Sequence, residues 1–298
     1  MRVPTYAATT TVISQIADLS SRQNELQDQV SSGQRVKLPG DDPAAVGRLL
    51  TLEAEKRRVG QFERNSDIAL ELTQATYSHL SAMKDLNVRA GELALLGTGT
   101  LGAEAAKAYA AEVDQLIEQA VRTGNGRLRD DYLFAGTAVK TEPIAVTRDA
   151  SGKITASTYA GNTDKRAIAL TEQSTLDVGS TGPTNTAIAD FINSLVTLRD
   201  ALTNGDRTAL DTSIAGLEAS EDVIVEAIGT TGAAEMRIEV GRKQLGTRSD
   251  EIERLVSAEA DADLPSTIVK LSQATTAYEA ALASASRILN MSILDYLR

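Results

Sequence analysis

Two stretches of heptad spacing, one near each end of the chain, constrain the fold more strongly than any other feature of the sequence. Near the N-terminus, the apolar residues that recur in steps of four and three, with Gln23 as one polar member, are Val12, Ile16, Leu19, Leu26 and Val30. Near the C-terminus, the same spacing joins Ile268, Leu271, Thr275, Tyr278, Leu282, Ala285 and Leu289. Such repeats are typical of helices that pack as coiled coils. We therefore predict long helices at both ends of the chain that pack against each other.

The two terminal helices are expected to need partners beyond each other. Residues 266–298 carry few charged side chains, which are Lys270, Glu279, Arg287, Asp295 and Arg298. A helix whose outer face meets water normally carries charges along that face. A ribbon of two helices also buries too few side chains to offset the conformational entropy that is lost on ordering. The sequence therefore predicts that the ends form an assembly interface, buried against copies of the same chain.

The middle of the chain follows a different pattern. Two β-branched runs, 144–147 and 154–159, flank a turn sequence rich in Asp, Ser and Gly, which indicates a hairpin. A further strand is predicted over 166–170, and the helical pattern returns near Ile188. We predict a mainly α fold with a small β insertion, in which long antiparallel helices form a bundle and the two terminal segments pair as a coiled coil. The predicted segments are a coiled coil at 1–42, a helical domain at 43–126 that continues at 186–258, a β-rich domain at 127–185, and a coiled coil at 259–298 that pairs with the first.

The turn after the first helix carries strong boundary signals. Gly33 follows two serines and is placed to end the helix in a left-handed conformation. Asp42 precedes Pro43, the order expected when an Asp side chain caps free amides and proline takes the first helical position. Asp41 and Asp42 are therefore interpreted as capping residues, with metal binding and acid–base chemistry as the less favoured alternatives.

Composition excludes most kinds of catalytic and metal chemistry. The chain has no cysteine, and His79 is its only histidine, so thiol nucleophiles, zinc–thiolate sites and multi-histidine metal sites are excluded. Gly97, Gly99 and Gly102 match a dinucleotide-binding pattern, but they follow a helical stripe rather than a strand, so we expect a loop. His79 lies on that stripe and is expected to be a packed structural side chain. We expect no enzyme, no catalytic residue, no cofactor and no bound metal.

Two classes of partner are also disfavoured. The net charge of −11 argues against nucleic acid as the main partner, because phosphate binding depends on clustered Lys and Arg. No segment approaches the ~18 uninterrupted apolar residues of a membrane span, so we expect no membrane insertion. Residues 3–17 lack the compact apolar run of a secretory signal peptide.

Several segments together resemble one family, the bacterial flagellins and their junction relatives. Residues 26–36, in which a helix ends in Ser-Ser-Gly, and residues 41–44, Asp-Asp-Pro-Ala, are similar to the N-terminal block of that family. Arg-Asn-Ser-Asp at 64–67 continues the likeness, and residues 257–264 resemble the turn before the family's last helix. The resemblance spans roughly the first 95 and the last 65 residues.

Two features resemble the junction relatives more than the flagellins themselves. One is Asn125-Gly126 followed by Tyr-Leu-Phe-Ala-Gly-Thr at 132–137. The other is the ending at 291–297, although phenylalanine is more usual in the family where Leu294 stands. By this resemblance, the residues that join the expected C-terminal interface are Ile293, Leu294, Tyr296 and Leu297.

The resemblance implies a structural subunit of the flagellum that adapts the hook to the filament. Its implied partners are hook-associated protein 1, flagellin, copies of itself in a ring, and a cytoplasmic export chaperone that holds the C-terminal helix. It implies type III export, an extracellular location, a role in motility, and an outer position for the β-rich domain. A chain that assembles outside the cell without cysteine also avoids disulfide mispairing.

Three alternatives remain open at this stage. A minor flagellin would polymerise into filaments by itself. A monomeric helical surface-binding module would keep ordered, protease-resistant ends without any assembly. An enzyme is the remotest alternative, and it would depend on His79 or on Asp41 and Asp42.

Overall fold

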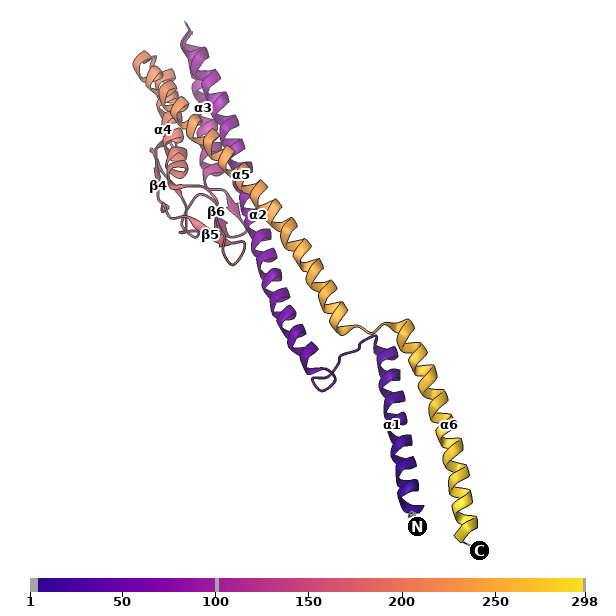
Figure 1. Cartoon of the computed structure of the whole chain (residues 1–298). Helices are drawn as coiled ribbons and strands as arrows, with labels where there is room; N and C mark the ends of the chain where they lie inside the picture. Colours follow the sequence, from indigo (N-terminus) through magenta and orange to yellow (C-terminus); the bar gives the residue numbers. More distant parts are fainter. Residues whose placement is uncertain (1–4, 100–101, 297–298) are drawn as a thin grey trace. The chain divides into compact units, whose positions relative to one another are not determined.

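The structure is a computed structural model that describes residues 5–99 and 102–296, with side chains described at 10–99 and 102–287. Within these residues the chain forms six helices and three two-stranded antiparallel sheets (Figure 1). The helices are α1 (Thr5–Ser32), α2 (Pro43–Gly97), α3 (Ala103–Gly124), α4 (Gly182–Asn204), α5 (Arg207–Ala260) and α6 (Leu264–Tyr296). The strands are β1 (Arg127–Leu128), β2 (Asp131–Tyr132), β3 (Ile144–Arg148), β4 (Ile154–Tyr159), β5 (Arg166–Ala169) and β6 (Thr175–Val178). The prediction of a mainly α fold with a small β insertion is confirmed.

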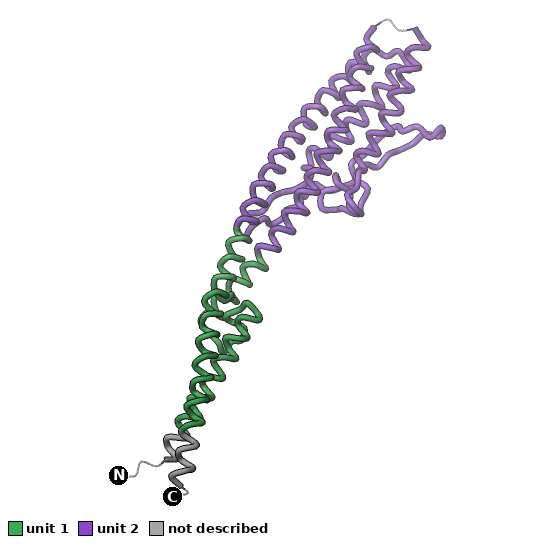
Figure 2. Tube along the Cα trace, turned by 90° about the vertical axis from the view of Figure 1, so that its right-hand side faces the viewer, with its two compact units in different colours: residues 1–58, 248–298 green, residues 59–247 purple. Residues whose placement is uncertain are grey.

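The chain divides into two compact units, which Figure 2 shows in different colours. Unit 1 comprises residues 1–58 and 248–298, and unit 2 comprises residues 59–247. The division falls inside α2 and inside α5, so each of these long helices contributes to both units. The boundaries that the sequence predicts at 42 and 258 describe helix ends, which are visible in a sequence, whereas contact density is not; those bounds stay a prediction.

Unit 2 has the main hydrophobic core, which α2, α3, α4 and α5 form together with the strands. Phe134, Phe191, Leu80 and Met83 are fully buried in it, and Ile144 and Ile154 bring the β3–β4 hairpin onto it. α3 packs along α4, and α4 also packs against β4. Among the described residues, every buried side-chain nitrogen or oxygen has a hydrogen-bond partner.

The β segment of unit 2 consists of three hairpins. β3 pairs with β4 from Ile144 opposite Tyr159, which confirms the predicted hairpin, and the register shifts after Thr147. β5, near the predicted strand at 166–170, pairs with β6. Buried Arg199 of α4 ties the β3–β4 hairpin to α3, because its Nη1 donates to the Ile154 carbonyl at 2.7 Å and lies 3.0 Å from Asp114 Oδ1.

Of two helix breaks in unit 2, one is predicted from the sequence and the other is not. The Gly97–Gly102 segment joins α2 to α3, as predicted for a loop rather than a nucleotide site. The break between α4 and α5 was not predicted, although Asn204-Gly205-Asp206 carries its signal. Gly205 has a φ of 66°, and Asp206 Oδ1 accepts a hydrogen bond from the amide of Thr208 at 3.0 Å. A left-handed glycine followed by an Asp cap is the usual way to end one helix and begin the next.

Candidate assembly interface

In unit 1, α1 packs along α6. The predicted N-terminal interface residues share the less exposed side of α1: Leu26 is buried, and Val12, Ile16, Leu19 and Val30 are half-buried. Their steps of four and three keep them on one side of a helix, where they form a continuous apolar strip. Ile13, which lies off this strip, is 62% exposed.

The packed side of α6 overlaps the predicted strip only in part. Thr267, Ala274 and Ala285 are buried, and Leu271 and Tyr278 are half-buried. In contrast, Ile268 is 52% exposed and Leu282 is 44% exposed. Small residues such as Ala274 allow two helices to approach closely, and the heptad pattern did not distinguish this side from the adjacent one. The side chains of Leu289, Ile293, Leu294 and Tyr296, and the whole of Leu297, lie outside the described residues.

The apolar surface of α6 is therefore wider than its packed side. Leu264 is 41% exposed, and it lies on the same side of the helix as Ile268 and Leu282 because their separations are close to whole helical turns. We call Leu264, Ile268 and Leu282 the exposed α6 stripe. Large apolar side chains aligned in this way are typical of a surface that another protein covers.

The connectors between the helices are joined by backbone hydrogen bonds. Gly33, with a φ of 72°, ends α1 in the left-handed conformation that its position predicts. The amide of Arg35 donates to the Ala260 carbonyl at 2.7 Å, and the amide of Ala262 donates to the Gly33 carbonyl at 2.8 Å. The connector after α1 and the connector before α6 thus form a short antiparallel bridge, with Gln34 opposite Asp261.

Charged side chains join the connector to both long helices. Arg48 of α2 donates from Nε and Nη2 to the two carboxylate oxygens of Glu259 in α5, each at 2.8 Å. Arg35 Nη2 donates to the Glu259 carbonyl at 2.7 Å, and Arg35 Nη1 donates to Asp42 Oδ2 at 3.1 Å. The hydrogen bonds from Arg48 lower the pKa of Glu259. Arginine binds a carboxylate through two parallel hydrogen bonds of defined geometry. The contacts between Arg48 and Glu259 therefore fix the position of α2 along α5 at this point.

Asp41 and Asp42 cap backbone amides, as their interpretation predicts. Asp42 Oδ1 accepts from the amide of Ala45 at 3.0 Å, behind Pro43 at the start of α2. Asp41 Oδ2 accepts from the amides of Lys37 and Leu38, at 3.0 and 2.8 Å. These bonds to the charged form lower the pKa of both carboxyl groups, with Arg35 a further cause for Asp42.

The described side chains form no metal-binding group. Within residues 10–99 and 102–287, no three His, Asp or Glu side chains lie close enough to hold an ion together. His79 is half-buried, as predicted; its Nδ1 lies 3.1 Å from the Thr123 carbonyl, and its ring meets Phe134 edge-on at 6.3 Å. None of the described helices is long and apolar enough to cross a membrane.

The connector caps predict a local acid sensitivity. Because the pKa values of Asp41 and Asp42 are lowered in the folded chain, their stabilising effect is complete above the ordinary value of 3.8 and is lost as the pH falls through the lowered values. We expect the amides of Leu38 and Ala45 to lose hydrogen-exchange protection in this acid range, after correction for the intrinsic exchange rate. Asp41→Ala, which removes the acceptor oxygens, should remove the protection of Leu38 at neutral pH also.

The matched control for this experiment is Asp18→Ala, which removes an exposed carboxylate on α1. It should leave the exchange of Leu38 and Ala45 unchanged. Full protection of Leu38 in Asp41→Ala would contradict the assignment of Asp41 as its cap.

The known proteins to which this chain is similar are flagellar proteins. Residues 3–139 match the bacterial flagellin N-terminal helical region. The flagellar hook-associated protein 3 of Escherichia coli K12 is 27% identical over 257 residues, which cover 80% of this chain and 77% of that protein. The flagellar filament 30.7 kDa core protein of Treponema maltophilum is 24% identical over 244 residues, which cover 81% and 80%.

Solved structures share the fold. A putative flagellar hook-associated protein from Vibrio parahaemolyticus aligns with a TM-score of 0.66 at 17% identity, over 74% of this chain and all of that one. The flagellar junction protein FlgL from Legionella pneumophila aligns with a TM-score of 0.52 at 13% identity, over 73% of this chain and all of that one. The fold of this chain therefore resembles that of solved flagellar proteins.

Proposed function

Because this flagellin-like chain carries the bacterial flagellin N-terminal helical region over residues 3–139, we propose that it is a structural subunit of the junction between the flagellar hook and the filament. The observation that carries the proposal is the likeness to flagellar hook-associated protein 3, which extends over 80% of the chain. In this role the chain binds hook-associated protein 1 on one side and flagellin on the other, and its function is packing rather than catalysis.

The paired terminal helices are the proposed assembly interface. The two packed sides of α1 and α6 hold the pair together, and the exposed α6 stripe is left for neighbouring copies in a ring. Burying such a stripe against a neighbour stabilises an assembly by about 25 cal/mol for each square ångström of apolar surface removed from water. The residues of α6 beyond 287 that the sequence assigned to this interface belong to the same proposal.

Export and location follow from the proposed role. A junction subunit is part of the extracellular flagellum, so the chain passes through the flagellar type III export channel and folds into place outside the cell. The C-terminal helix, with its apolar sides, is the segment that a cytoplasmic chaperone would cover before export. The absence of cysteine from the chain suits this route, because no disulfide can form wrongly during passage.

A minor flagellin is the second candidate. The similarity to a flagellar filament core protein, at 24% identity over 81% of the chain, favours it. The two candidates differ in self-assembly: a flagellin polymerises into long filaments at high salt, whereas a junction subunit stops at a short ring. Electron microscopy of the purified chain after incubation at high salt distinguishes them.

The decisive experiment is deletion of the gene in the organism that carries it. A strain without the junction subunit should be non-motile, keep its hooks, and release flagellin monomers into the medium. Electron microscopy of its basal bodies and immunoblots of the culture supernatant measure these outcomes. Normal filaments in the deletion strain would contradict the proposal.

Charged substitutions in the exposed α6 stripe test the interface itself. Ile268→Asp and Leu282→Asp should each reduce rescue of motility in the deletion strain by about tenfold or more, because each places an unpaired charge in a buried contact. The unfolding midpoint of the purified chain should change little, since both positions are about half exposed before assembly.

Gln273→Asp is the matched control, because Gln273 is polar and exposed on the same helix. It should restore swimming to the level of the unmodified gene. Full rescue by Ile268→Asp would exclude the stripe from the interface, and a large drop in the unfolding midpoint would show that its effect arises within the chain.

A further inference from the structure

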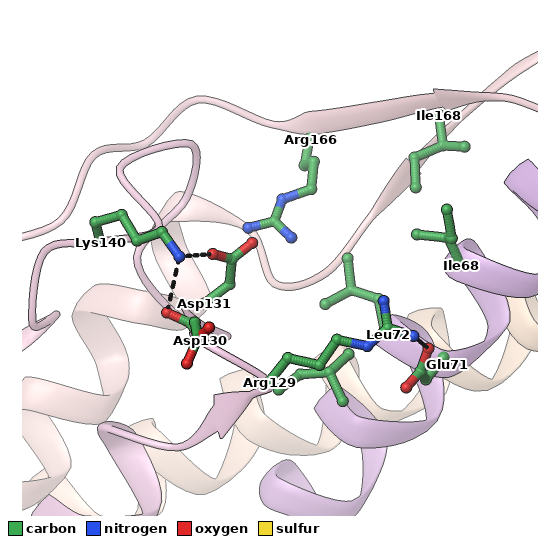
Figure 3. Close-up of a pocket in the computed structure, with 10 residues that line it drawn as sticks. Ile68, Glu71, Leu72, Arg129, Asp130, Asp131, Lys140, Arg166 and Ile168 are labelled. Carbon is green, nitrogen blue, oxygen red and sulfur yellow. Dashed lines mark hydrogen bonds and ion pairs between the residues drawn. The ribbon is translucent and has the colours of Figure 1, made fainter.

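A cavity of about 290 Å³ in unit 2 has no part in the assembly described above. Three separate segments form it: α2, the segment from β1 through Lys140, and β5 (Figure 3). Its opposite sides differ in character. Ile68 and Leu72 of α2 and Ile168 of β5 form an apolar wall, and the rest of the lining is charged apart from Leu128.

Two of the three cations around the cavity are already paired. Arg129 Nη2 donates to Glu71 Oε2 at 2.5 Å, and this pair joins the β1–β2 turn to α2. Lys140 Nζ lies 2.9 Å from Asp131 Oδ1 and donates to the Asp130 carbonyl at 3.2 Å. Arg129 has a φ of 56°, and it is the only residue other than glycine with a positive φ in the described chain. An uncommon backbone conformation, held in place by an ion pair, is a feature of sites built for binding.

Arg166 is the cation that the described residues leave without a partner. It is half-buried on β5, and its side chain points into the cavity (Figure 3). The hydrogen bond from Lys140 lowers the pKa of Asp131, and the charge of Arg166 is a further cause. None of the described residues, however, forms a hydrogen bond or an ion pair with the Arg166 guanidinium. A guanidinium is always charged and offers several donors in a fixed plane, so a half-buried one normally binds an anion.

We propose that the cavity binds a small monocarboxylate, with its carboxylate on Arg166 and its apolar body against Ile68, Leu72 and Ile168. The volume suits a molecule or a side chain of this size, near the lower end of ligand pockets. The inference stands apart from the junction role, because it depends only on unit 2.

Charge selects a monocarboxylate over a phosphate. Glu71, Asp130 and Asp131 supply three negative charges around the same cavity, which balance Arg129, Lys140 and Arg166. A phosphate group with close to two negative charges would meet those carboxylates, whereas a monoanion needs only the one unpaired guanidinium. The apolar wall further favours an anion that carries carbon on one side.

Titration with 4-methylpentanoate, followed by NMR of the full-length chain with labelled arginine, tests the proposal. Saturable shifts of the Arg166 Nε–Hε signal are expected, with a Kd on the order of 1 mM. Binding to the variants is followed through the Nε–Hε signal of Arg129, which also lines the cavity. Arg166→Gln should weaken binding by about tenfold or more, because the charge-assisted contact is lost. Arg166→Lys should weaken it less, because it retains the charge while losing the two-point geometry.

Three controls complete the design. Arg122→Gln, which changes an exposed arginine on α3 outside the cavity, should bind like the unmodified chain. The uncharged 4-methylpentanamide should not shift the Arg166 signal, and inorganic phosphate should bind more weakly than the carboxylate. Each variant is first shown to unfold at the same midpoint as the unmodified chain. If Arg166→Gln is destabilised, the affinity of Arg166→Lys is compared with that of the unmodified chain instead.

The proposal is overturned if 4-methylpentanoate produces no saturable shift. An affinity in Arg166→Gln equal to that of the unmodified chain would also overturn it, since binding would then not involve the guanidinium. Phosphate binding as tight as the carboxylate would overturn the assignment of the ligand class.

Discussion

Replacing Phe134 by alanine is expected to lower the free energy of unfolding by about 3–5 kcal/mol, the usual range for removing a buried aromatic ring. Phe134 is fully buried, and it packs edge-on against the His79 ring within the main core of unit 2. It lies in the loop between β2 and β3, where Leu133 and Ala135 are buried beside it. The loop therefore depends on this ring for its attachment to the core.

Urea denaturation of the full-length chain, followed by circular dichroism, measures the loss. Phe134→Leu keeps most of the apolar volume and should cost about 1–2 kcal/mol. Tyr77→Ala removes an aromatic side chain that is 41% exposed on α2 and should change stability much less. A loss for Phe134→Ala no greater than that of Tyr77→Ala would show that the loop is not anchored by the ring.

Gly126→Ala is expected to cost about 3 kcal/mol, because the added methyl group has no room. A Cβ atom at position 126 would lie 2.2 Å from His79 Cε1 and 2.4 Å from Nδ1. The imidazole has little freedom to move away, since Nδ1 is hydrogen-bonded to the Thr123 carbonyl and the ring packs on Phe134. The cost is measured by the same urea denaturation.

A double-mutant cycle with His79→Ala identifies the cause. Without the imidazole the clash disappears, so Gly126→Ala should cost about 2 kcal/mol less in the His79→Ala background. Gly91→Ala is the matched control, because a Cβ there meets nothing within 4 Å, and it should be neutral or slightly stabilising. Equal costs of Gly126→Ala in both backgrounds would contradict the steric explanation.

The sequence predicted the local features of this fold well. Helix ends at Gly33 and Asp42, the β3–β4 hairpin and the loop at Gly97–Gly102 all depend on neighbouring residues, and each carries its own signal. The break at Gly205 carries a signal of the same kind. The apolar helical pattern that continues on both sides of Gly205 masks this signal.

Features that depend on distant residues could not be predicted in the same way. The pairing of Arg48 with Glu259 joins side chains 211 residues apart, and nothing in one sequence indicates which charges meet. The packed side of α6 is a similar case. Two adjacent sides of the helix, one with Ala274 and the other with Ile268, both fit a heptad, and only the position of α1 selects between them.

The cavity at Arg166 was not predicted either, for a related reason. Its residues come from α2, the β1–β2 turn and β5, and each segment alone shows only an ordinary mixture of apolar and charged side chains. The one local signal was Arg-Asp-Asp at 129–131, a charged turn between two short strands. Such a turn indicates exposure to water and does not indicate which cation lacks a counter-ion.

The bridge between the connectors has a mechanical consequence. Two connecting segments link the long helices to the terminal helix pair: residues 33–42 join α1 to α2, and residues 261–263 join α5 to α6. Backbone hydrogen bonds join the two segments where Gln34 faces Asp261. A single connecting segment transmits little twist, because rotation about its single bonds relieves any twist that is applied. Two segments that are joined at one level cannot rotate independently, so twisting this joint winds one segment around the other. The joint can therefore transmit torque.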